Sequence, residues 1–187
     1  KEVELLDLFP TVADLAGVPL PSSRSTASAA APPSAGGGYE GMGGRSLAAQ
    51  LERPTNESDG IAFSQIARCW PAGAPHEAST HQQMGQCDGV PSSEYAFFGY
   101  SMRTAGARFT EWVPTRWDAA TGTHRPQWGE TVASELYDHA TTDDVAELWS
   151  ERSENANLAA TRIVESEAMR QRLRAHFDRV LLDAVAV

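Results

Sequence analysis

The sequence has little positive charge and no long apolar run. Lys and Arg number 15 against 25 Asp and Glu among 187 residues, and the formal net charge of −10 argues against a nucleic-acid partner bound through its phosphates. No apolar stretch approaches the roughly 20 residues that cross a bilayer, and the first residues do not resemble a signal peptide. We therefore expect no nucleic-acid partner and no membrane span. Because no initiator Met is present, we expect the chain to begin inside a larger protein.

Self-sufficient catalytic motifs are missing as well. The sequence has no Gly-rich phosphate loop, no GxSxG nucleophile elbow and no HExxH pair. Its 5 histidines are scattered, with no carboxylate at metal-ligand spacing, so surface or capping roles are expected for them. We therefore assign no catalytic residue and no metal ligand within the chain.

The two cysteines lie in a stretch that has the composition of a loop. A disulfide between Cys69 and Cys87 would close a loop worth roughly 3 kcal/mol, provided that the compartment is oxidising. The alternatives are two free thiols, or a zinc site with His76 and His81, although Cys69 and His76 do not match the usual ligand spacing. We predict the disulfide. A glycosylation sequon at Asn56 matters only if the chain enters a secretory pathway.

Helical spacing is found near the start of the chain. One amphipathic stripe is formed by Leu5, Leu8, Phe9, Val12, Leu15 and Ala16. Asp7 is the expected N-cap, because Pro10 then lies in the first turn, and Gly17 ends the helix. Residues 20–44 are rich in Pro, Ser, Ala and Gly and are expected to be a loop. Ser46 is the expected cap of a short helix that follows.

The remainder predicts a small sheet and a terminal helix. Residues 61–65 and 134–138 have strand composition, and 95–104 with 107–113 form the clearest hairpin, which places Phe98, Tyr100 and Met102 on one face and Arg103 on the other. Residues 114–131 are expected to be a loop. A helix follows from the spacing of Met169, Leu173, Phe177, Val180, Leu181 and Ala184. The predicted fold is α+β, a small antiparallel sheet with a C-terminal helix packed on one face.

Several short segments, in order, carry a family resemblance. Residues 3–17 resemble a helix that type I sulfatases place late in their catalytic domain, and 44–47 (GRSL) resemble the "G-x-S-L" segment that follows it. Residues 62–65 (AFSQ) resemble the "A-x-S-Q" strand of iduronate-2-sulfatases. The most specific match is GYSMRT at 99–104 with RFTEWV at 108–113, which is similar to the "G-Y-S-[IM]-R-T … R-Y-T-x-W-V" hairpin of the same enzymes.

A last pair of segments extends the resemblance toward the C-terminus. Residues 135–138 (ELYD) and 157–159 (NLA) resemble the pattern "E-L-Y-D … E-x-x-N-L-A". The resemblance implies that 1–19 end an alkaline-phosphatase-like α/β catalytic domain, that 20–44 are a low-complexity loop, and that 45–187 form the sulfatase C-terminal subdomain.

The resemblance also implies where the chemistry lies. Type I sulfatases use a formylglycine made in a C-x-P-x-R or S-x-P-x-R motif, and a Ca²⁺ ion that neutralises the sulfate. Neither motif is present, because Cys69 has Gly73 where the arginine is required. Formylglycine and Ca²⁺ are therefore expected in an upstream catalytic domain, which becomes the implied partner. A secretory location is implied, either lysosomal or extracellular, or periplasmic in a bacterium.

The fragment itself could supply part of the substrate pocket for a sulfated glycan. Five side chains after the hairpin are candidates, because arginine forks suit sulfate and carboxylate and tryptophan faces suit sugar rings: Arg116, Trp117, His124, Arg125 and Trp128. The alternative is that these tryptophans pack the loop and these arginines are solvated. Two other functions stay open. One is a phosphonate or phosphodiester hydrolase of the same superfamily, and the other is a non-catalytic β-rich binding module.

Overall fold

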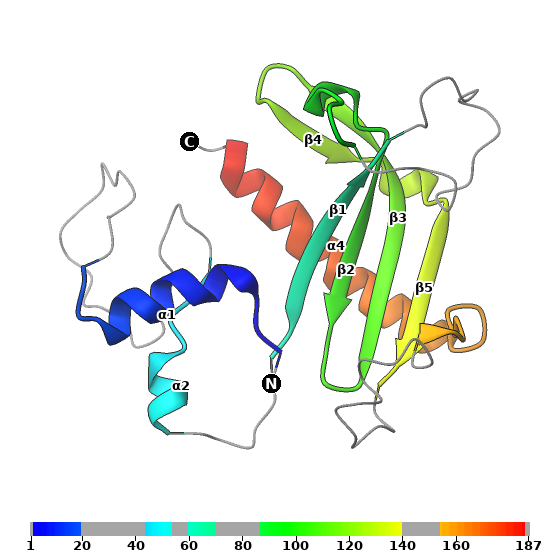
Figure 1. Cartoon of the computed structure of the whole chain (residues 1–187). Helices are drawn as coiled ribbons and strands as arrows, with labels where there is room; N and C mark the ends of the chain where they lie inside the picture. The colour runs from blue at the N-terminus through cyan, green and yellow to red at the C-terminus, as the bar shows by residue number, and fades with distance from the viewer. Residues whose placement is uncertain (1, 20–43, 54–59, 70–86, 140–153, 186–187) are drawn as a thin grey trace. The chain divides into compact units, whose positions relative to one another are not determined.

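The computed structural model describes residues 2–19, 44–53, 60–69, 87–139 and 154–185, with side chains of the last helix up to residue 181. Contacts divide the chain into two units, Lys1–Ala62 and Phe63–Val187. The first is helical and the second holds the sheet and the long helix (Figure 1). Among the described helices, none has the length and apolar character that a membrane span requires.

The helical unit contains a short 3-10 turn, η1 (Leu5–Asp7), followed by α1 (Leu8–Leu15) and α2 (Ala48–Glu52). Asp7 is the N-cap of α1, as predicted, but its side chain does not cap that helix. Its carboxylate instead accepts the backbone N–H of Arg45 at 2.8 Å and that of Glu4 at 3.1 Å. Asp7 therefore joins two segments of this unit.

Further bonds attach the segment before α2 to α1. The Thr11 hydroxyl accepts the Leu47 N–H at 2.9 Å, and the Ser46 hydroxyl donates to Asp14 at 2.5 Å. Gly44 has φ +76, and a Cβ there would lie 2.2 Å from a backbone oxygen, so no larger residue fits. This set of bonds attaches residues 44–47 to α1, a connection that composition does not reveal.

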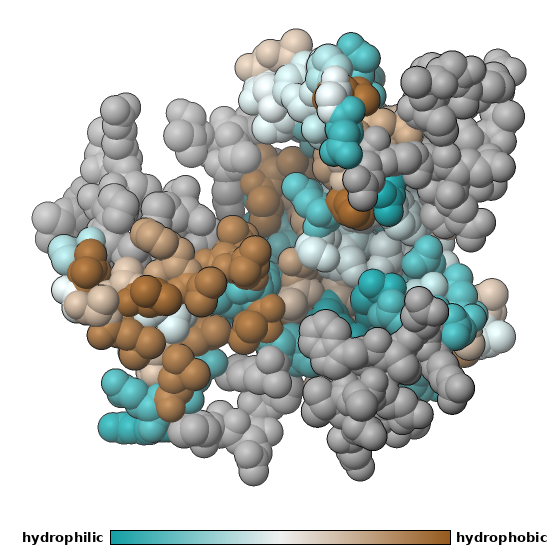
Figure 2. All heavy atoms as spheres, viewed as in Figure 1, coloured by the Kyte–Doolittle hydropathy of each residue, from teal (hydrophilic) through white to brown (hydrophobic). Residues whose placement is uncertain are grey.

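The apolar stripe of the first helices is exposed. Leu5 is 86% exposed, and more than half of each side chain is also exposed for Leu6, Leu8, Phe9, Val12 and Leu15. The buried residues of the same segment are Asp7, Pro10, Thr11 and Ala13. Figure 2 shows apolar residues gathered over α1 and α2. The side of α1 that its own chain covers is thus the more polar one.

The second unit contains most of a five-stranded antiparallel sheet. Its strands are β1 (Ala62–Arg68), β2 (Phe97–Arg103), β3 (Ala107–Asp118), β4 (Thr123–Pro126) and β5 (Ala133–Asp138). The hydrogen-bonded order is β1-β2-β3-β4, and β5 pairs with the first half of β3. In the central hairpin Met102 lies opposite Phe109 and Tyr100 opposite Glu111.

Helix α4 (Ile163–Val185) covers one face of this sheet (Figure 1). Its side chains Met169, Leu173 and Phe177 are buried, and the sheet contributes fully buried Met102 and Phe109 among others. The predicted α+β fold is confirmed. One element was missed, because residues 114–131 are not a loop: β3 continues to Asp118 and returns as β4, with a 3-10 turn η4 (Trp128–Glu130) after it.

Candidate functional site

The candidate site predicted after the hairpin is a second hairpin, called here the arm (residues 115–126). In its register Arg116 lies opposite Arg125 and Trp117 opposite His124. Because side chains alternate along a strand, the two arginines share one face of the arm and the Trp–His pair shares the other. The structure therefore brings four of the five predicted residues together and sorts them by chemistry.

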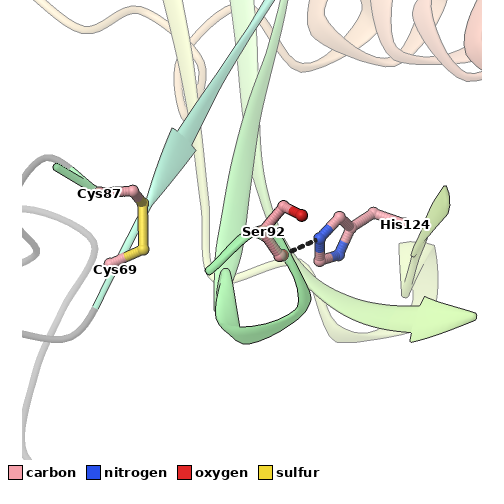
Figure 3. The surroundings of a disulfide bond; sticks show 4 residues. All are labelled: Cys69, Cys87, Ser92 and His124. Carbon is pink, nitrogen blue, oxygen red and sulfur yellow. Dashed lines mark hydrogen bonds between the residues drawn. A yellow bond between two sulfur atoms is a disulfide. The ribbon is translucent and has the colours of Figure 1, made fainter. Parts of the chain in front are cut away.

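On the aromatic face, His124 is held by hydrogen bonds at both ring nitrogens. One nitrogen is 2.6 Å from the backbone oxygen of Ser92 (Figure 3), and the other is 3.2 Å from the Thr115 hydroxyl. Its ring stacks on Tyr95 at 5.7 Å and tilts against Trp117 at 5.0 Å. Engaged at both nitrogens, His124 positions the arm.

On the charged face, one arginine is tied and the other is exposed. Arg125 donates to Asp118 at 2.9 Å, and this bond lowers the pKa of the Asp118 carboxyl below its ordinary value. Arg116 is exposed, and among the described residues it has no carboxylate partner. Arg116 is therefore the guanidinium of the arm that is available to an anionic ligand.

Trp128, the fifth predicted residue, lies elsewhere. Its indole N–H donates to Asp178 of α4 at 2.8 Å, and its ring is 5.0 Å from that of Tyr100. The Arg174 guanidinium lies over the ring at 5.3 Å. These contacts attach the turn after β4 to the terminal helix.

The disulfide lies near the base of the arm. Cys69 and Cys87 are bonded with an S–S distance of 2.12 Å, which links the end of β1 to the segment preceding β2 (Figure 3). No histidine takes part in this linkage, and His76 and His81 lie outside the described residues, as does Asn56. In the described part of the chain, no group of three or more His, Cys, Asp or Glu side chains could hold a metal ion.

A buried ion cluster, not predicted from the sequence, lies between the sheet and α4. Glu111 is 0% exposed, and Arg174 binds its carboxylate through two nitrogens, at 3.0 and 2.5 Å. Arg170 approaches it at 3.2 Å and the Thr131 hydroxyl donates to it at 2.8 Å. The pKa of Arg174 is raised, chiefly by the hydrogen bond from its guanidinium to Glu111. Nearby, burial and then Asp178 raise the pKa of Tyr100.

The sequence did contain a signal for this cluster. Glu111 is two positions from both Phe109 and Val113, and residues two apart on a strand face the same side. Phe109 and Val113 face the core, so the Glu111 side chain must be buried as well and needs a cation. Arg170 and Arg174 are spaced by one helical turn and therefore present two such cations on the same face of α4.

The other face of the sheet, called here the second face, is partly polar. The Trp112 indole N–H donates to Glu135 at 2.9 Å, and Arg68 lies 5.8 Å from the ring centroid. Trp112 also lies directly over Gly99, where an added Cβ would be 2.8 Å from the ring. Gly99 is therefore required by this close approach of the indole.

At the edge of the sheet, Asn157 holds β5. Its side-chain oxygen accepts the Leu136 N–H at 3.0 Å, and its amide donates to the Ser134 carbonyl at 3.0 Å. An edge strand otherwise presents unpaired backbone groups. Asn157 thus satisfies two of them although it lies 21 positions beyond Leu136.

Comparison with family models and with curated proteins finds no match for this chain. The functional conclusion accordingly depends on the residues and their geometry.

Proposed function

We propose that this chain is the C-terminal portion of a type I sulfatase similar to iduronate-2-sulfatases, acting on sulfated glycans as part of the complete enzyme. The observation that carries the proposal is that segments chosen only for their family resemblance bind one another. Asp7 and Thr11 of the first motif accept backbone N–H groups of the 44–47 motif. Hydrogen bonds between the two motifs give one structural explanation for the presence of both in the same chain.

The same holds within the sheet. In the hairpin motif, Gly99 accommodates Trp112, and the two are cross-strand partners. In the last motif pair, Asn157 binds the backbone of the strand formed by 135–138. These contacts join motif residues that lie apart in sequence, which is the pattern expected of one inherited scaffold.

The exposed stripe of α1 favours the proposed partner, an upstream catalytic domain. A contiguous apolar surface of this kind marks an interface. The polar side of α1 is already bound to residues 44–48, so the stripe is the side left for the rest of a larger domain. Formylglycine and Ca²⁺ belong to that domain in this proposal.

The arm is the part of this chain proposed to line the substrate pocket. Arg116 offers an exposed guanidinium beside the aromatic pair of Trp117 and His124. Sulfate or carboxylate would bind the guanidinium fork. The disulfide between Cys69 and Cys87 suits the proposed secretory location, because such bonds persist in oxidising compartments.

The preceding coding sequence is the first test. We expect a C-x-P-x-R or S-x-P-x-R motif with an early Asp-Asp pair. A start codon immediately before Lys1 would sink the proposal in favour of a binding module. A full-length protein that cleaves a phosphodiester and leaves sulfate esters intact would select the phosphoesterase alternative.

Substitution of Arg116 tests the role of the arm in the full-length enzyme. With a sulfated disaccharide, Arg116→Gln is expected to raise KM several-fold, because one charge-assisted bond is worth about 1.5–3 kcal/mol when desolvated and less when exposed. With a small aryl sulfate, which does not reach the arm, kcat/KM should stay unchanged. Arg172→Gln, an exposed arginine of α4, is the matched control. Equal effects on both substrates would remove the arm from the pocket.

A further inference from the structure

Two arginines lie directly opposite each other on the second face, next to the turn between β2 and β3. Arg103 and Arg108 are cross-strand partners, and both are half-buried. Residues opposite each other in an antiparallel pair point to the same side, and like charges in that position destabilise the sheet. The arrangement therefore calls for negative charge close to both side chains.

The described residues supply only part of that charge. Arg108 forms an ion pair with Glu154 at 2.5 Å and lies 5.3 Å from the Tyr137 ring centroid. Its Nε is buried and, within the described residues, has no hydrogen-bond partner. Arg103 has no ion pair with any carboxylate of the described residues. Of the two guanidinium groups, only that of Arg108 has a carboxylate partner among the described residues.

A third titratable group, a histidine, lies at this corner. His139 is buried at the end of β5, 3.2 Å from Glu154. Burial and then repulsion from Arg103 lower the pKa of His139, although Glu154 opposes that shift. The Arg103 guanidinium is therefore close enough for its charge to act on the buried imidazole.

We propose that Arg103 and Arg108 form a binding site for one oxyanion, either a tetrahedral sulfate or phosphate or a carboxylate. Guanidinium groups bind such anions through a planar fork, and Arg103 is the principal ligand because its fork has no acidic partner among the described residues. The proposal is independent of the sulfatase assignment, because the site lies on the second face and uses no residue of the arm.

Unfolding of the full 187-residue chain in sodium sulfate, compared with sodium chloride at equal ionic strength, tests this site. Sulfate also stabilises proteins generally, in a way that does not saturate at low concentration and is shared by all variants. Beyond this general effect, sulfate should raise the unfolding midpoint of the wild type by an amount that saturates as the site fills. Arg103→Gln should raise the sulfate concentration at half-saturation about tenfold or more, because the variant loses one charge-assisted bond to the anion. Arg172→Gln should follow the wild type.

Two further comparisons make the outcome decisive. In chloride, Arg103→Gln should be at least as stable as the wild type, since it removes a like-charge contact. A parallel titration with acetate identifies the anion class. The anion that reaches half-saturation at the lower concentration is the one that the site prefers, either the carboxylate or the tetrahedral sulfate. Arg103→Lys keeps the charge without the fork and should give intermediate affinity.

Three results would overturn the proposal. The first is a saturable response that is identical in the wild type and in Arg103→Gln. The second is an Arg103→Gln variant that is clearly less stable in chloride, which would mean that Arg103 already has an acidic partner in the chain. The third is the absence of saturation with either anion.

Discussion

The buried carboxylate between β3 and α4 permits a quantitative prediction. Glu111 is fully buried, and Arg174 supplies two of its bonds. Arg174→Met would keep the length and apolar packing of the side chain while removing the charge. Breaking a buried pair in this way typically costs about 3–5 kcal/mol, because it leaves an uncompensated charge in the interior.

The lower end of that range applies here. Arg170 and the Thr131 hydroxyl still contact the carboxylate after the substitution, and Arg174 itself is partly hydrated at 30% exposure. We therefore expect a loss of about 3 kcal/mol, a large share of the roughly 5–15 kcal/mol that stabilises a domain. Glu111→Gln should cost less, about 1.5–3 kcal/mol, because an amide keeps neutral hydrogen bonds.

Urea unfolding followed by tryptophan fluorescence and far-ultraviolet circular dichroism measures these losses. With a slope of about 1–3 kcal/mol per molar urea, a loss of 3 kcal/mol lowers the midpoint by roughly 1–3 M. The control is Arg172→Met, the same change at an exposed position of the same helix. The double variant Glu111→Leu with Arg174→Met should lose less stability than the sum of the two single changes, which reveals the coupling between the two side chains.

If Arg174→Met cost no more than Arg172→Met, Glu111 would not depend on its partner. In that case the cluster would behave as a solvated surface pair, which contributes about 0–1 kcal/mol. The burial argument would then be refuted.

Three further predictions concern the sheet unit. Gly99→Ala should lower stability by about 1–3 kcal/mol and shift the Trp112 fluorescence, because the ring must move, whereas Gly129→Ala, where an added Cβ meets nothing, should not. Reduction of the disulfide should cost roughly 3 kcal/mol and lower the urea midpoint, and an unchanged midpoint would contradict it. The folded pKa of His139 lies below its ordinary value of about 6.5, so the unfolded chain binds more protons below that pH; stability should fall as pH drops through this range, and less steeply in His139→Gln.

The central hairpin was predictable because its signals are local. Alternation of apolar residues along β2 and β3, with a short turn between them, determines both the register and the faces. The predicted placement of Phe98, Tyr100 and Met102 on one face agrees with the burial of all three. A one-residue slip would have exposed the whole set, so the pattern admits few alternatives.

The arm was missed for an equally local reason. Pro114 follows the last strongly apolar residue, Val113, and a proline inside a strand pattern argues against its continuation. In the structure β3 runs through Pro114, whose carbonyl accepts the Gln127 N–H at 2.9 Å. A proline that accepts a ladder bond without donating one is tolerated, and this role depends on a partner 13 residues away that the pattern does not identify.

Long-range bonds account for the other differences at the candidate site. Trp128 binds Asp178, which is 50 positions away, and the choice between a pocket residue and a packing residue depends on that bond. Arg116 and Arg125 have the same residue type, yet only Arg125 reaches Asp118. Composition indicates where arginines are concentrated, but register determines which guanidinium is left available.

The first helix shows how a pattern can be right in period and uninformative about its partner. Its apolar residues do recur at helical spacing, which predicts one buried stripe. The structure buries the opposite side, because Asp7 and Thr11 bind the backbone of residues 44–47. A helix cannot keep such a stripe in water without a compensating interface. In the full-length enzyme proposed above, replacing exposed Leu5 and Phe9 with serine should therefore lower the folded yield, while in the isolated chain the same change should raise solubility. If the substitutions changed folded yield and solubility in the same direction in both proteins, the partner of this stripe would not be the proposed catalytic domain.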